Sequence, residues 1–482
     1  MVQRRRQNRR ETPARQARDE GHSRPNKISA STAYDFSARN LTPYGGLFPV
    51  ATMLEKLGFQ ELVEEAVTCS RKTRAMSLYQ FVLAIVFGVY VGFERLNQLR
   101  FIAQDPLVTG ILNVESLPPQ STLWRFLASL GRHVSDQLLG VQQRLRERVW
   151  AAANVKLAAV TLDTDTTVHT LYGQQMGARK SYNPKNKGKL SYQPILTFIA
   201  ETREYLMGGL HNGDRPSGKE IAAHIRRAVR ALPSGIQTVY ARADSGFYCG
   251  EAIQAYREMN CQFVVVARKT SRLLEELTRA RWTGSPRTDA DAQCEFRYQP
   301  DGWEQECRFV ALRYEKEPET PEETEQYQLF ETTHYIYRVF VTNMIEPIAD
   351  VVWFYNQRAG AENLIKEANN DCGLAAHPSK RFDMNGNHFQ MAMLAYNLNV
   401  WLQLFHREPE ADVASLRHTT LAIARLRFLF IAAKIWTHAG RTGIRYSDHY
   451  QEQGTFDRLM VRLRKITRDG AGWPPVIDAA FA

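Results

Sequence analysis

The chain has 482 residues, which is too long for one ordinary hydrophobic core, so about two to four domains are expected. A content of 44% hydrophobic and 11% aromatic residues excludes a protein that is disordered throughout. The formal net charge of +11 predicts a polyanionic partner, either nucleic acid or an acidic membrane surface. We favour nucleic acid and no membrane partner. The longest apolar run, residues 81–93, is shorter than the roughly 18 residues of a spanning helix, and is typical of a buried helix.

The first 40 residues form a basic segment with little apolar content. We expect residues 1–40 to be a disordered tail that contacts nucleic acid, with a passive solubilising tail as the alternative. No apolar stretch follows the basic start, so a signal peptide is not predicted. The cysteines form no C-x-x-C pair and match no zinc spacing, so we expect reduced thiols and a cytoplasmic protein. They are Cys69, Cys249, Cys261, Cys294, Cys307 and Cys372.

Residues 41–152 carry helical periodicity and are predicted to be a helical DNA-binding or dimerisation region. Apolar residues recur at helical spacing from Phe48 to Leu57, and Gly58 is expected to end that helix. Further on, Ser121 or Thr122 follows a Pro-Pro turn and can cap a short helix that presents Arg125. This is compatible with a helix-turn-helix element that contacts DNA, but pure structural packing is the alternative.

From residue 153 the pattern changes to short strands that alternate with helices. Strands are expected at 157–162, 194–199, 204–210, 237–243 and 261–267, and helices at 219–232 and 251–259. The second and third strands form a predicted hairpin. Together these elements predict a mixed α/β sheet over residues 153–270, which we take as the first part of a catalytic core.

Three further regions follow this sheet. Alternating runs at 294–298, 308–314 and 335–341 predict a β-rich insertion over residues 271–345. Helical periodicity then predicts a second part of the core at 346–405 and a C-terminal basic helical region at 406–482. In the last region, cations interleave with apolar residues as in an amphipathic basic helix, which would face DNA or a second protomer rather than a membrane surface. These cations are Arg417, Arg425, Arg427, Lys434, Arg441 and Arg445.

Carboxylates lie at the ends of two predicted strands. Asp165 follows the first strand and Asp244 follows the strand at 237–243. Strand ends hold side chains rigidly at the edge of a sheet, where ligands of open α/β sheets bind. Asp163 lies two residues before Asp165 on the same strand face, so either of the two could be the first metal ligand. Gly246 permits a sharp turn after Asp244.

A third carboxylate, Glu362, is predicted on a later helix. Tyr355, Arg358 and Glu362 are spaced so that they share one helical face. Glu367 lies about 140° further round the helix, which favours Glu362 as the ligand. A surface helix with an ordinary Arg358–Glu362 ion pair is the alternative. Two Mg²⁺ ions about 3.5–4 Å apart, held by such carboxylates, could activate a water or hydroxyl and stabilise the leaving oxygen of a phosphoryl transfer.

The motifs around these residues resemble bacterial insertion-sequence transposases of the DDE type. They are Asp165-Thr-Thr, Tyr172-Gly-Gln-Gln-Met-Gly-Ala178, Tyr182-Asn-Pro184, Arg242-Ala-Asp-Ser-Gly-Phe247 and Tyr355-x-x-Arg358-x-x-x-Glu362. The resemblance is nearest to the insertion-sequence 1380 family, a relative of the group with a Tyr-Arg-Glu-Lys signature, and covers roughly residues 45–470. The signature lysine falls at Asn369 here, and Lys366, one turn after Glu362, is the candidate substitute for it.

This resemblance implies an RNase H-like core, two Mg²⁺ ions that Mn²⁺ could replace, and catalytic metal ligands Asp165, Asp244 and Glu362. It also implies cut-and-paste movement of an element through terminal inverted repeats, by a homodimer that joins two DNA ends to target DNA in the bacterial nucleoid. Tyr355 and Arg358 would hold phosphates near the cleaved end. An RNase H-like nuclease without strand transfer, and a catalytically silent DNA-binding protein, are the alternatives.

Other residues are predicted to contact DNA around this site. Four lysines between the first two strands would lie over it and bind phosphates, although a solvated turn is the alternative: Lys180, Lys185, Lys187 and Lys189. Arg242 either reaches a phosphate or forms an ion pair with a nearby carboxylate. Trp303, at a predicted hairpin tip, could stack on a flipped base as in related transposases that form DNA hairpins, with Trp282 and Trp353 as further candidates.

Overall fold

A computed structural model describes residues 27–70, 76–315, 335–407, 418–467 and 476–477. The chain divides into two units, residues 1–39 and residues 40–482. The helices and strands below belong to the second unit. Most of the predicted basic tail, and the prediction at Arg417, lie outside the described residues.

Helices make up the first part of the second unit, as the sequence predicts for residues 41–152. Gly58 adopts a left-handed conformation with φ of 65° between α2 and α3, which explains why the first helix ends there. Ser77 and Gln80 form a capping box at the start of α4, the buried helix predicted from the apolar run. The elements are β1 (Leu41–Thr42), α2 (Leu47–Lys56), α3 (Phe59–Ala66), α4 (Leu78–Tyr90), η2 (Leu96–Phe101), α5 (Pro106–Leu112), α6 (Gln120–Ser129) and α7 (Val134–Ala152).

The prediction that Ser121 or Thr122 caps the helix that carries Arg125 is wrong. Helix α6 begins at Gln120 with Pro119 in the capping position, where no side chain makes a capping hydrogen bond. Pro119 has φ of −63°, which the proline ring already favours. Ser121 and Thr122 therefore lie inside the helix, where their side chains cannot serve as the N-cap.

The centre of the unit is one nine-stranded mixed sheet with the order β10-β11-β12-β13-β9-β8-β3-β6-β7. Strands β3, β8 and β9 are parallel, and β6 and β7 form the predicted antiparallel hairpin beside β3. The strands are β3 (Ala159–Thr166), β6 (Ile195–Ile199), β7 (Glu204–Gly209), β8 (Thr238–Ala243), β9 (Cys261–Val266), β10 (Thr283–Gly284), β11 (Ala292–Tyr298), β12 (Cys307–Glu315) and β13 (Tyr335–Thr342).

The β-rich segment predicted as an insertion continues this sheet. Strand β13 pairs antiparallel with β9, so β10 to β13 extend the core on one side instead of forming a separate layer. Alternate residues of these strands serve two cores. Phe309 and Ala311 pack on one face of the sheet, while Val310 and Leu312 pack on the other. Burial on both faces explains why β12 is apolar over four consecutive residues.

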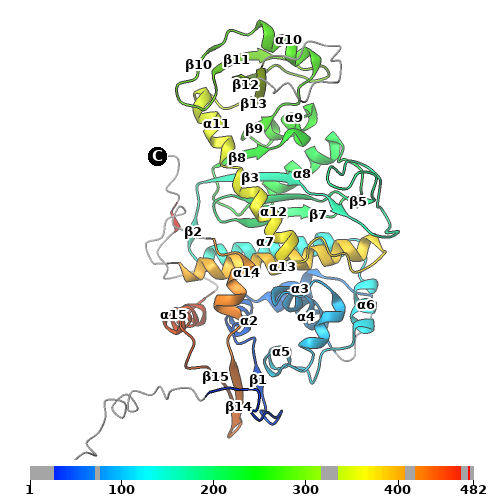
Figure 1. Ribbon diagram of the computed structural model, residues 1–482, viewed down its shortest axis with the longest axis vertical. Coiled ribbons are helices and arrows are strands. Elements are labelled where there is room, and N and C mark those ends of the chain that lie inside the picture. The colour runs from blue at the N-terminus through cyan, green and yellow to red at the C-terminus, as the bar shows by residue number, and fades with distance from the viewer. Residues whose placement is uncertain (1–26, 71–75, 316–334, 408–417, 468–475, 478–482) are drawn as a thin grey trace, which may run out of the picture. The chain divides into compact units, whose positions relative to one another are not determined.

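Helices cover both faces of the sheet, as Figure 1 shows. One cluster of buried side chains joins the sheet to α8, α9 and α10, and other clusters join it to α11, α12, α13 and α7. These helices are α8 (Gly218–Arg230), α9 (Gly250–Glu258), α10 (Ser271–Arg279), α11 (Ile348–Asn356), α12 (Ala359–Asp371) and α13 (Phe382–His406). The remaining short elements near the sheet are β2 (Val155–Lys156), β4 (His169–Thr170), β5 (Ser191–Tyr192), η3 (Ser245–Phe247) and β16 (Val476–Ile477).

The C-terminal region is not the basic amphipathic helix that the sequence predicts. After the short α14 (Leu421–Ala424) and the π-helical turn η5 (Arg425–Leu429), the chain forms the hairpin β14 (Ala433–His438) and β15 (Arg441–Tyr446). Strand β14 also pairs with β1, almost 400 residues earlier. Helix α15 (Gln453–Arg464) follows the hairpin. Pairing with a distant strand therefore overrides the local helical spacing of apolar residues.

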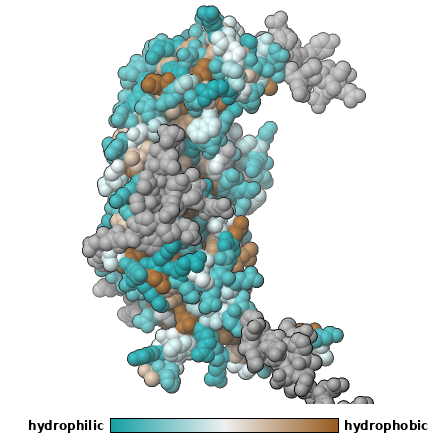
Figure 2. Space-filling view, turned by 90° about the vertical axis from the view of Figure 1, so that its left-hand side faces the viewer, coloured by the Kyte–Doolittle hydropathy of each residue, from teal (hydrophilic) through white to brown (hydrophobic). Residues whose placement is uncertain are grey.

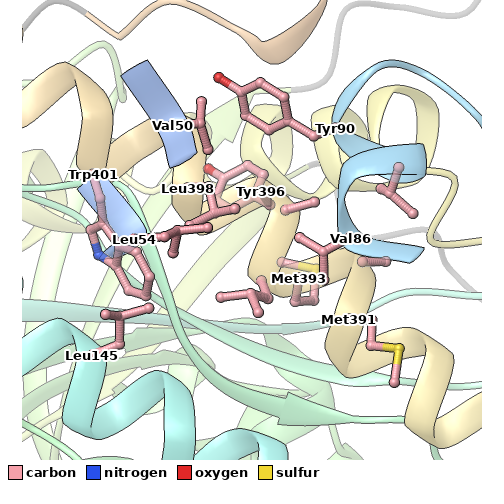
Figure 3. Close-up of a cluster of buried hydrophobic side chains, with 14 of the residues drawn as sticks. Val50, Leu54, Val86, Tyr90, Leu145, Met391, Met393, Tyr396, Leu398 and Trp401 are labelled. Atoms are coloured by element: carbon pink, nitrogen blue, oxygen red, sulfur yellow. The ribbon is translucent and has the colours of Figure 1, made fainter. Parts of the chain in front are cut away.

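The largest core lies where α2, α4, α7 and α13 meet. Figure 3 shows Val50, Val86, Leu145, Met393 and Trp401 converging from these four helices, and all are buried. The apolar side chains are thus mostly internal, and the face in Figure 2 is largely hydrophilic with small separate hydrophobic patches. Within the described residues, the helices are too short or too polar to cross a membrane.

A buried carboxylate joins the helical part to the sheet. Glu204 of β7 is fully buried and accepts hydrogen bonds from Arg146 Nε at 2.9 Å, Trp150 Nε1 at 2.6 Å and Trp401 Nε1 at 2.7 Å. Arg146 also donates to the carbonyl oxygen of Tyr205. The carboxylate thus connects α7, β7 and α13 through charged and neutral donors.

We predict that Arg146→Met strongly destabilises the protein, by about 3–5 kcal/mol, because the Glu204 charge would stay buried without its counterion. The matched control is Arg144→Met on the same helix, which breaks an exposed ion pair with Glu65 and should cost about 1 kcal/mol or less. Urea unfolding of both variants measures the difference. Equal shifts in the two unfolding midpoints would contradict this role of the buried pair.

Candidate active site

The parallel pairing of β3 and β8 brings two predicted catalytic carboxylates together. The register pairs Asp163 with Arg242 and Thr164 with Ala243, so Asp165 and Asp244 are the next residues at the carboxyl ends of neighbouring strands. Paired residues of parallel strands point to the same face of the sheet. The negative charge of Asp244 contributes to raising the pKa of Asp165, which reflects how close the two groups are.

Asp163, the alternative first ligand, is bound within the protein. Arg242 donates to both of its carboxylate oxygens, from Nε at 2.7 Å and from Nη2 at 2.8 Å. The remaining Nη1 of Arg242 donates to the carbonyl oxygen of Phe354 in α11. Both side chains are about 95% buried or more. Of the two interpretations of Arg242, the structure therefore shows the ion pair, and its guanidinium is not exposed to a phosphate.

Asp165 lies in a less enclosed position with a different arginine. Its Oδ1 accepts the backbone N–H of Thr166, and Arg358 Nη2 lies 2.6 Å from its Oδ2. Burial raises the pKa of Asp165 to about 6, the positive charge of Arg358 opposes that rise, and Asp244 adds to it. A cation placed between the two aspartates would favour the ionised form of both.

The turn after β8 holds Asp244 at the sheet edge. Its Oδ1 accepts the N–H of Gly246, and a Cβ atom at position 246 would lie 2.8 Å from that oxygen. Arg268 donates to the carbonyl oxygen of Ser245 and braces the turn from β9. Gly246 therefore has a steric reason to be glycine, since the turn brings its backbone against the carboxylate.

The segment that carries Glu362 is broken, whereas the sequence predicts one continuous helix. Helix α11 ends at Asn356 and α12 begins at Ala359, with Arg358 in the capping position between them. Tyr355 is buried against Phe340, with ring centroids 4.9 Å apart. Glu362 lies in the first turn of α12, and its side chain is 71% exposed. Because the helix breaks at Arg358, that side chain can bind Asp165 on the sheet and still reach Glu362.

Arg358 is the link between the sheet edge and Glu362. Its Nη1 lies 3.7 Å from Glu362 Oε1, and its Nη2 binds Asp165. Glu367 lies on another side of α12, as helical phase predicts, where it accepts the N–H of Leu421 and contacts His418. Among the described residues, no three acidic, histidine or cysteine side chains lie close enough together to form a metal site. Asp165 and Asp244 lie at neighbouring strand ends, whereas Glu362 is connected to Asp165 through Arg358.

The donor set at this edge fits a hard divalent cation. Two carboxylates lie at neighbouring strand ends, and the negative charge of Asp244 helps to raise the pKa of Asp165. Oxygen ligands of this kind suit Mg²⁺, and an ion there would offset the repulsion between Asp165 and Asp244. Asp165 and Asp244 are thus candidate ligands on the sheet, and Glu362 is a third candidate on the adjacent helix.

The residues predicted to contact DNA differ in their surroundings. The four predicted lysines of the loop between β4 and β5 are all exposed. Lys366 is exposed on α12, and Arg125 is exposed but donates to Ser121 and Thr122 of its own helix. Trp303 lies in the loop between β11 and β12, as predicted, and packs on Tyr248 with ring centroids 5.0 Å apart. Trp353 is 57% exposed, and Trp282 donates to Leu277 beside Arg313.

Sequence reasoning missed a partly buried polar cluster next to the site. Asn369 of α12 contacts Thr167 and His169, which follow Asp165 in the chain, and His169 contacts His377. The departure of position 369 from the signature lysine was a visible signal. The histidines gave none, because their spacing matches no metal motif and they are distant in sequence.

A mixed α/β sheet with paired aspartates at the ends of its parallel strands characterises this site. The chain belongs to the family described as transposase DDE domain group 1, whose model matches residues 26–468. It is therefore a transposase of the DDE type. No curated protein matches the chain. Among solved structures it is similar to the piggyBac transposase synaptic complex with hairpin DNA, with a TM-score of 0.41 and 11% identity over 78% of this chain and 79% of that one.

We predict that Asp163→Asn destabilises the protein by about 3–5 kcal/mol, because the buried Arg242 charge would lose its counterion. Asp244→Asn should stay within about 1 kcal/mol of wild type, since asparagine keeps the oxygen that accepts the Gly246 N–H. Denaturant unfolding of the two variants tests this. If Asp244→Asn were the more destabilised variant, Asp244 would be a structural residue and the division of roles would fail.

Proposed function

We propose that this transposase cuts and joins DNA strands with Asp165, Asp244 and Glu362 as its catalytic metal ligands. The observation that carries the proposal is the register of β3 and β8, which puts Asp165 and Asp244 on neighbouring strand ends of a DDE family member. The binding of Asp163 by Arg242 favours Asp165 as the first ligand. Two divalent ions, Mg²⁺ or Mn²⁺, would activate the attacking oxygen and stabilise the leaving oxygen of the phosphoryl transfer.

The sheet supports an RNase H-like core for this activity. Strands β7, β6, β3, β8 and β9 are neighbours in this order, with the last three parallel and the first two added as an antiparallel hairpin. Strands β10 to β13 extend this unit, and α12 brings Glu362 to the same edge as Asp165 through Arg358. This arrangement suits a triad with two rigid members and one member on a helix.

Arg358 has a second role in this proposal. Its guanidinium keeps a positive charge beside Asp165, which favours the ionised carboxylate that a metal ion requires. Because Arg358 is buried beside Asp165, its positive charge would act on a phosphate of the DNA end through the electrostatic field at the site. Tyr355 lies near both aspartates and Arg358, as the contributions to its raised pKa reflect. We assign both residues to the positioning of that end.

The DNA in this proposal is the double-stranded terminal inverted repeat of an element and its target. The exposed lysines Lys180, Lys185, Lys187 and Lys189, together with Arg125 and Lys366, would bind phosphates without reading the sequence. A homodimer would hold two element ends in one complex and move the element by cut-and-paste transposition. The motif resemblance favours the insertion-sequence 1380 family.

We predict that Asp244→Ala binds inverted-repeat DNA like wild type but loses Mg²⁺-dependent strand cleavage by about 10³-fold or more, because a metal ligand is lost. Cleavage of end-labelled DNA and a gel-shift titration measure the two properties. Asp136 of α7 is exposed and forms an ion pair with Arg227 of α8, so Asp136→Ala is the control and should cleave normally.

Undiminished nicking by Asp244→Ala would overturn the catalytic assignment. Wild-type cleavage without transfer of pre-cleaved ends to target DNA would favour a nuclease that does not join strands. Tight DNA binding by wild type with no cleavage in Mg²⁺ or Mn²⁺ would favour the catalytically silent alternative.

A further inference from the structure

Asn369 of α12 binds the segment that leaves β3 just after Asp165. Its Nδ2 donates to Thr167 Oγ1 at 3.2 Å, and its Oδ1 lies 2.9 Å from His169 Nε2. Thr167 and His169 follow Asp165 by two and four residues. One amide side chain thus joins the helix of Glu362 to the strand exit of Asp165.

The hydrogen bonds of this cluster have a defined direction. Burial lowers the pKa of His169 to about 4 and that of His377 to about 3, so both imidazoles are neutral near pH 7. Since Asn369 Oδ1 can only accept, His169 Nε2 must donate to it. The Nδ1 of neutral His169 then accepts from His377 Nε2, 3.2 Å away. An uncharged relay therefore runs from His377 through His169 and Asn369 to Thr167.

This relay lies at the opposite end of α12 from Arg358. A helix rises about 1.5 Å per residue, so positions 358 and 369 are roughly 16 Å apart along α12. Arg358 binds Asp165 and Asn369 binds Thr167 and His169, so α12 runs along the exit of β3 and is held to it at both ends. Figure 1 shows α12 crossing in front of β3.

Other contacts of α12 hold a different side of the helix. Glu367 accepts the N–H of Leu421 and contacts His418, and Arg425 donates to the carbonyl oxygen of Asp371. These contacts join α12 to α14 and η5, so they do not set its position relative to Asp165. Asn369 supplies side-chain hydrogen bonds that do.

We propose that Asn369, with His169 and Thr167, is a positioning residue that sets where α12 presents Glu362 to Asp165 and Asp244. The inference rests on the proposed catalytic triad. In the related signature this position is lysine, whose ammonium group has no acceptor for the N–H of His169 and so could not replace Asn369 in this partly buried relay. In this chain Asn369 makes contacts within the protein, which favour a structural role for position 369 over a phosphate contact.

The test uses full-length protein and inverted-repeat DNA. Asn369→Lys introduces the signature residue, and Thr167→Val removes the acceptor at nearly constant shape, whereas Thr167→Ser keeps it. Asn363→Ala changes an exposed asparagine on the same helix and is the control. Single-turnover cleavage, the half-saturating Mg²⁺ concentration, DNA affinity, the urea midpoint and calorimetric Mn²⁺ binding without turnover are measured for each variant.

We predict that Asn369→Lys and Thr167→Val cleave about 10²-fold more slowly, because a displacement of about 1 Å in a reacting group has that effect. Both should need several-fold more Mg²⁺ and bind Mn²⁺ more weakly, with DNA affinity unchanged. Thr167→Ser should recover most of the rate, and Asn363→Ala should resemble wild type. The double variant should be no slower than either single variant.

Equal or faster cleavage by Asn369→Lys would overturn the proposal and favour a phosphate contact at position 369. Slow cleavage explained wholly by a lower urea midpoint, with normal Mg²⁺ dependence, would reduce the relay to a fold-stabilising contact and also overturn it. If the wild-type protein itself fails to cleave DNA, the proposed catalytic triad is wrong. If wild type cleaves and the Asn369 and Thr167 variants match it, only the positioning role fails.

Discussion

The bidentate ion pair between Asp163 and Arg242 is the constraint on which the candidate site depends. It connects β3 to β8 inside the protein, and the third donor of Arg242 connects both strands to α11 through Phe354. A buried pair of this kind tolerates little displacement, since either charge alone would be costly. The next residues on the same face, Asp165 and Asp244, are consequently held side by side at the strand ends.

The third carboxylate is held by weaker means. Glu362 is exposed and reaches the sheet through Arg358, which also binds Asp165. The helix break at Arg358 permits this double contact, and Asn369 anchors the far end of the same helix. In the proposed site, the sheet would therefore preorganise two ligands, and the position of the third would depend on how α12 is oriented. A third ligand on a separately held helix would suit a site that admits DNA before all its metal ligands are in place.

Sequence alone predicts the sheet strands well because burial on both faces makes them short, continuous apolar runs, as at Phe309 to Leu312. It also predicts that Glu362 and Glu367 lie on different sides of a helix, because that follows from helical phase. Sequence alone does not predict features that depend on contacts between distant parts of the chain. Lys434 lies on β14, which pairs with the distant β1 as well as with β15, and the partners of Arg358 and Asn369 come from another part of the chain. No local pattern specifies such partners.

We propose that Asp165, Asp244 and Glu362 surround the same metal ions, and replacing Mg²⁺ with Fe²⁺ tests this shared site directly. In the presence of ascorbate and peroxide, bound Fe²⁺ generates hydroxyl radicals that cut the nearby polypeptide, and mass spectrometry locates the cuts. With inverted-repeat DNA bound, we expect cuts near residues 165, 244 and 362, all suppressed by excess Mg²⁺. Cuts confined to other segments, or cuts near the two aspartates without any near Glu362, would contradict the shared site.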